Sequence, residues 1–121
     1  MSHVYYILDE QHRVQSARDV IEWGKWYENS NNRRVARTQF ECGVMVSTVF
    51  IGIDHRWLRF DGPGPPLVFE TMTYEATEAG GWDDERRYSS WDDAEMGHKA
   101  VVRRVKALLE KAGLSTVEIT D

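Results

Sequence analysis

Two apolar segments separated by a loop rich in glycine and proline constrain the fold of this 121-residue chain more than any other feature. Residues 44–53 form a run rich in β-branched side chains, and residues 67–74 form a second such run. Between them lies Gly62-Pro63-Gly64-Pro65-Pro66, which combines the strongest breakers of regular structure. Because consecutive strands tend to be neighbours, we expect residues 44–53 and 67–76 to pair antiparallel.

Shorter segments complete the expected sheet. Loose alternation before Cys42-Gly43 predicts a strand that turns back into residues 44–53, and Gly80-Gly81 marks a later reversal of the chain. The shorter strands are predicted at residues 4–8, 34–41, 86–88 and 116–120.

The last helix has the clearest local pattern in the chain. Ser90 is the predicted N-cap, with Asp93 three residues later as in a capping box, and Gly113 is the predicted end. Apolar residues recur at helical spacing over residues 91–112, and His98 lies on the same face. This helix should therefore bury one face against the sheet.

A shorter helix is predicted over residues 17–28, with Ser16 as its N-cap. Strands joined by short turns, together with two helices, favour an α+β domain. We expect a single domain over residues 1–121, built from an antiparallel β-meander of about five strands with two helices packed on one face.

The net charge of −5 argues against a general nucleic-acid-binding protein, because such proteins usually present a basic excess. One local basic cluster consists of Arg33, Arg34 and Arg37. With stacking aromatic rings, this cluster is compatible with a small anionic ligand such as a nucleotide.

Cysteine usage and hydropathy indicate a cytoplasmic protein. Cys42 is the only cysteine, so no intramolecular disulfide can form, which fits a reducing compartment. The beginning of the sequence lacks the pattern of a signal peptide, and the apolar run at residues 44–53 is too short to span a bilayer.

Polar residues within apolar segments are candidates for chemistry, because burying an unpaired charge is costly. His55, Glu70 and His98 could form a metal site for Zn²⁺ or another divalent cation, or an acid–base pair, with Asp54 or Glu95 in support. We expect Glu70 and His98 to meet if the last helix packs across the central strands.

Structural interpretations of the same residues remain open. His98 is more typically a hydrogen-bonded core histidine than a ligand or a catalytic base. Glu70 could pair with Arg86 or Arg87 on the next strand, and Asp54 could cap the loop that follows it.

The loop at residues 55–66 suggests a binding function instead. It carries aromatic side chains between arginines, and these residue types dominate interface energetics. The alternative is that these rings fold back over a small core. The candidate binding residues are Arg56, Trp57, Arg59 and Phe60, joined by Trp82 from the later loop.

Three segments carry a resemblance to known sequences: residues 46–55, 66–72 and 87–98. Together with the opening Tyr5-Tyr6-Ile7-Leu8-Asp9, they make the chain similar to a group of small uncharacterised proteins encoded by bacteriophages and bacteria. The likeness covers about residues 4–110. It implies a phage or prophage origin, and it carries no known activity.

We therefore expect a small accessory protein of phage type that binds a host protein or a small ligand, with counter-defence as one role. An enzyme or metal-binding protein using His55, Glu70 and His98 is the first alternative, and a nucleotide-binding sponge is the second. No cofactor is expected in the binding interpretation. An exposed strand edge would also allow a homodimer.

Overall fold

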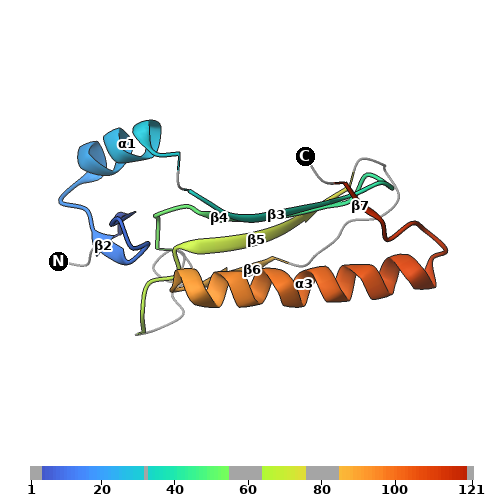
Figure 1. Ribbon diagram of the computed structural model, residues 1–121. Helices are drawn as coiled ribbons and strands as arrows, with labels where there is room; N and C mark the ends of the chain where they lie inside the picture. The colour runs from blue at the N-terminus through green and yellow to red at the C-terminus, as the bar shows by residue number, and fades with distance from the viewer. Residues whose placement is uncertain (1–3, 32, 55–63, 76–84, 120–121) are drawn as a thin grey trace.

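The computed structural model describes residues 4–31, 33–54, 64–75 and 85–119, and its architecture is α+β (Figure 1). A short helix follows the first two strands, and a long helix lies between the sixth strand and the last. In chain order the elements are β1 (Tyr6–Leu8), β2 (Val14–Ser16), α1 (Val20–Asn29), β3 (Arg34–Phe40), β4 (Met45–Phe50), β5 (Phe69–Tyr74), β6 (Arg86–Tyr88), α3 (Trp91–Lys111) and β7 (Glu118–Ile119).

A five-stranded antiparallel sheet forms the centre of the fold, in the order β6-β5-β4-β3-β7. β3 to β6 follow one another as a meander, and β7 returns after α3 to pair with β3. The expected pairing of the two apolar segments is confirmed, with Thr48 opposite Thr71 and Phe50 opposite Phe69. Gly43, with φ of 100°, allows the tight turn between β3 and β4.

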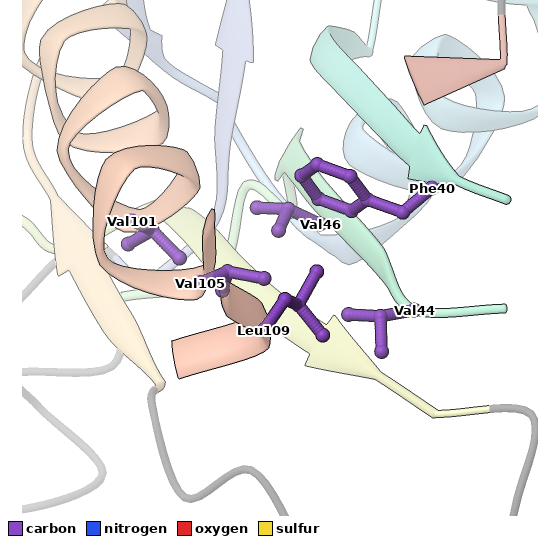
Figure 2. Packing of buried hydrophobic residues seen from close by; sticks show 6 residues of the cluster. All are labelled: Phe40, Val44, Val46, Val101, Val105 and Leu109. Carbon is purple, nitrogen blue, oxygen red and sulfur yellow. The ribbon is translucent and has the colours of Figure 1, made fainter. Parts of the chain in front are cut away.

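Helix α3 lies along one face of this sheet (Figure 1). It begins as expected, because the Ser90 hydroxyl accepts a hydrogen bond from the backbone N–H of Asp93 at 3.1 Å. The apolar face of α3 packs on β3 and β4, where aliphatic side chains interlock around one phenyl ring (Figure 2). This core cluster contains Phe40, Val44, Val46, Val101, Val105 and Leu109.

Helix α1 differs from the expectation of two helices on one face. It lies beyond one end of the sheet and packs mainly on β1, while α3 alone runs along the sheet (Figure 1). The predicted N-cap, Ser16, is wrong because residues 14–16 form β2, paired with β1 in a separate hairpin. The N-cap is Asp19, whose carboxylate accepts from the N–H of Glu22 at 2.9 Å.

An irregularity in β3 changes which side chains share a face. Arg34 lies opposite Val49 and Ala36 lies opposite Thr48, so Val35 is an extra residue in the strand. In a regular strand, Arg34 and Arg37 would point to opposite faces. The bulge places both on the face that α3 does not cover, and bulges commonly redirect side chains in this way.

Neither helix in the described part of the chain is long and apolar enough to cross a membrane.

Candidate functional site

His98 lies near the middle of the sheet face of α3 and is only 5% exposed. Its Nε2 lies 2.9 Å from Oγ1 of Thr38 on β3, and its Nδ1 lies 2.7 Å from Oγ1 of Thr48 on β4. Thr48 Oγ1 lies 2.6 Å from Oγ1 of Thr71 on β5. One imidazole therefore connects α3 to three strands through a network of threonine hydroxyls.

This threonine network (Thr38, Thr48 and Thr71) suits a neutral imidazole. A neutral ring offers one N–H donor and one acceptor nitrogen, and a hydroxyl can take either role. Burial lowers the pKa of His98 from its ordinary value of 6.5, while the charge of Glu118 partly opposes that shift. A buried neutral ring that is hydrogen-bonded to threonine hydroxyls fixes the helix on the sheet, which favours the structural interpretation of His98.

Glu70 lies on the opposite face of the sheet. It precedes Thr71, whose side chain joins the network with His98, and successive strand residues point to opposite faces. Its Oε2 lies 3.4 Å from Nε of Arg87, the residue opposite it on β6. The prediction that Glu70 and His98 meet is therefore wrong, whereas the alternative pairing of Glu70 with Arg86 or Arg87 is confirmed for Arg87.

The metal or acid–base site does not assemble from the described residues. The Asp54 carboxylate accepts from the N–H of Leu67 at 3.0 Å and so joins the two ends of the loop, as its capping role predicts. Glu95 accepts from the indole N–H of Trp91 at 2.5 Å. His55 lies outside the described residues, and within them no group of three or more His, Cys, Asp or Glu side chains could hold a metal ion.

Most of the predicted binding loop, residues 55–63, lies outside the described residues. Its aromatic and basic residues, and the tryptophan of the later loop, lie outside the described residues, so their role in an interface stays a prediction. These residues are Arg56, Trp57, Arg59, Phe60 and Trp82.

The structure instead brings part of the basic cluster into a concave site. A hollow of about 470 Å³ lies between the end of α1, the start of β3 and the end of β4. We call it the arginine hollow. It is lined by Tyr27, Ser30, Asn31, Arg33, Arg34 and Val49.

Arg33 is held in place by contacts to the end of α1. The centre of its guanidinium lies 3.8 Å from the ring centroid of Tyr27, and its Nε donates to the carbonyl oxygen of Ser30 at 3.4 Å. The Tyr27 ring packs in turn against Trp23, with centroids 5.0 Å apart. These contacts order the side chain of Arg33 before any ligand arrives.

Arg34 and Arg37 have different positions on the same face. Arg34 is exposed and lies opposite Val49, so the β3 bulge places it at the hollow. Arg37 lies farther along the strand, where its Nη2 donates to Oε1 of Gln39 at 3.2 Å, and it does not line the hollow. The expected three-arginine cluster is therefore a pair at the hollow with a third arginine beside it.

Tyr27 and Val49 were not expected at a site. In the sequence both fit the apolar pattern of their elements, the helix face and the central strand. The available signal was the arrangement of an aromatic helix end, a polar turn at residues 29–32 and two arginines directly after it.

Comparison with protein-family models, curated proteins and solved structures gives no significant match for this chain.

Proposed function

We propose that the protein binds a small anionic ligand in the arginine hollow. The observation that carries this proposal is the composition of the hollow: Arg33 and Arg34 line it, and none of the described residues that line it carries a carboxylate. The chain as a whole carries a net charge of −5, so this local excess of positive charge runs against the overall balance.

The chemistry of the two arginines supports a phosphate or carboxylate group as the recognised anion. A guanidinium presents a planar fork of N–H donors that can bind two oxygens of such a group at once. Because Arg33 is already stacked on Tyr27, little side-chain entropy is lost when a ligand binds to it. Val49 supplies an apolar wall.

Isothermal titration calorimetry with inorganic pyrophosphate tests this proposal. Arg34→Gln should weaken binding by about tenfold or more, because a hydrogen bond to a charged group contributes about 1.5–3 kcal/mol. Arg37→Gln is the matched control, since it removes the same charge from the same strand and face outside the hollow. Loss of the Arg37 charge should change the affinity by less than about threefold, because salt screens the attraction of a charge that lies outside the hollow.

Two results would contradict the proposal. If the wild-type protein bound no pyrophosphate at low salt, the hollow would not be an anion site. Equal losses of affinity in Arg34→Gln and Arg37→Gln would mean that the anion binds to the charged face as a whole and not in the hollow.

We also propose, from the resemblance to phage-encoded proteins alone, that this binding serves an accessory role such as counter-defence. The arginine hollow favours a small ligand over a host protein as the partner. Affinity purification from a bacterial host, with proteins and small molecules both identified, tests this setting. If a host protein were recovered in stoichiometric amount without a small anion, the host protein would be the favoured partner.

A further inference from the structure

A second hollow adjoins the arginine hollow at the end of α1. It also has a volume of about 470 Å³, and it shares Ser30 and Asn31 with the first hollow. Trp26 and Asn29 also line it. We call it the tryptophan hollow. The two hollows therefore meet at Ser30 and Asn31, in the segment that joins α1 to β3.

The two hollows differ in chemistry. The arginine hollow carries the cations, while the tryptophan hollow carries an indole ring and the side-chain amides of Asn31 and of Asn29, whose Nδ2 also donates to the carbonyl oxygen of Lys25 at 2.7 Å. An indole face stacks on planar aromatic rings, and side-chain amides match the donor and acceptor edges of nucleobases. Trp26 is fixed in position by its edge-to-face contact with Phe50, with centroids 5.4 Å apart.

The end of α1 adds a preference for hydrogen-bond donors. The last carbonyl groups of a helix lack intrahelical N–H partners and carry partial negative charge. α1 ends at Asn29, and the last turn contains no basic residue. A ring that presents an amino group to the tryptophan hollow would therefore be favoured over a ring that presents only oxygen there.

We infer that the ligand is a nucleotide with an amino-bearing base, its phosphate at Arg33 and Arg34 and its base in the tryptophan hollow beside Trp26. This inference rests on the proposed binding of anions and specifies the ligand class. It also assigns separate tasks to the two hollows: the arginine hollow supplies the charge interaction, and the tryptophan hollow supplies selectivity for the base.

Calorimetry on the full chain with three related ligands tests this assignment. Adenosine monophosphate should bind about tenfold or more tightly than ribose 5-phosphate, which has the phosphate but no base. Inosine monophosphate, whose base has an oxo group in place of the amino group, should bind more weakly than adenosine monophosphate. The three ligands share the phosphate group and the ribose.

The outcomes separate this inference from the proposed function. Equal affinities for adenosine monophosphate and ribose 5-phosphate would overturn the base site and leave the anion site standing. Failure of all three ligands and of pyrophosphate to bind would overturn both. Equal affinities for the adenosine and inosine nucleotides would overturn the preference for an amino group.

The variant Trp26→Leu tests whether the base binds in the tryptophan hollow. Trp26→Leu should reduce the affinity for adenosine monophosphate to the level of ribose 5-phosphate and leave ribose 5-phosphate binding unchanged. Retained ribose 5-phosphate binding also shows that the variant folds, which matters because Trp26 packs on the core. Saturation-transfer NMR on wild-type protein gives an independent readout: transfer from indole protons to the base protons supports the inference, and transfer to the ribose alone contradicts it.

Discussion

The Nδ1 atom of His98 on α3 lies 2.7 Å from the hydroxyl oxygen of Thr48 on β4, the central strand of the five-stranded sheet. This contact joins the long helix to the sheet within the buried layer between them. Its partners, Thr38 and Thr71, come from the strands on either side of β4. The network specifies one position of the helix, since sliding α3 along the sheet would leave these buried groups unpaired.

Replacing His98 should therefore reduce stability, and because the buried ring is neutral, the replacement leaves no unpaired charge. His98→Leu leaves buried threonine hydroxyls without their imidazole partner, and we expect a loss of about 1–3 kcal/mol in the free energy of unfolding. Urea denaturation measures this loss. Lys99→Ala, at an exposed position next to it on α3, is the control and should stay within about 0.5 kcal/mol of wild type. Equal values for both variants would show that the network adds nothing to stability.

The burial of His98 also predicts how stability depends on pH. The folded state lowers its pKa below the ordinary value of 6.5, so below that pH the unfolded chain binds the proton more readily than the folded protein does. Stability is fully present above pH 6.5 and falls as the pH drops toward the folded-state pKa, by at most about 1.4 kcal/mol per pH unit.

Denaturation curves between pH 7.5 and pH 5 test this dependence, with His98→Gln as the comparison. The variant should show a weaker loss of stability over that range, because its side chain does not titrate. Parallel pH profiles for the two proteins would assign the loss to other groups.

Two helical glycines should respond in opposite ways to alanine. An alanine Cβ at position 97 would clash with the ring of Tyr88 on β6, whereas one at position 24 meets no atom within 4 Å. Gly97→Ala should destabilise the protein by about 1–3 kcal/mol despite the better helix propensity of alanine. Gly24→Ala should stabilise it by about 0.5–1 kcal/mol. Thermal denaturation measures both, and stabilisation by Gly97→Ala would mean that Tyr88 does not pack against α3.

The ion pair on the open face makes a separate prediction. Arg87 contacts Glu70, whose side chain is 11% exposed, and Glu85, whose side chain is 51% exposed. Glu70→Gln should cost about 1–3 kcal/mol because it weakens a largely buried charge interaction. Glu85→Gln should cost less than about 1 kcal/mol, since solvent screens an exposed pair. Chemical denaturation compares them, and a reversed order would contradict the burial of the Glu70–Arg87 contact.

Local patterns in the sequence were enough to predict most of the secondary structure. Turn residues and alternation located the β3–β4 hairpin, and the antiparallel pair β4–β5 followed from two apolar runs. Ser90 as N-cap and the apolar periodicity located α3. The predictions failed at the start of α1, where residues 14–16 pair with β1 instead of leading into the helix. Residues 14–16 pair with residues 6–8 across a short hairpin, and the helical pattern of the residues that follow does not indicate this pairing.

The sequence by itself determined which side chains alternate, where the strands turn and which face of the last helix is apolar, because these follow from backbone geometry over a few residues. Only the tertiary structure decided that α3 covers the face of Thr71 and not that of Glu70, which separates His98 from Glu70. It also decided that the extra residue Val35 brings Arg34 onto the face of Arg37. Both outcomes depend on packing and on the register of paired strands. A change of register by one residue moves the side chains that follow to the other face of the sheet.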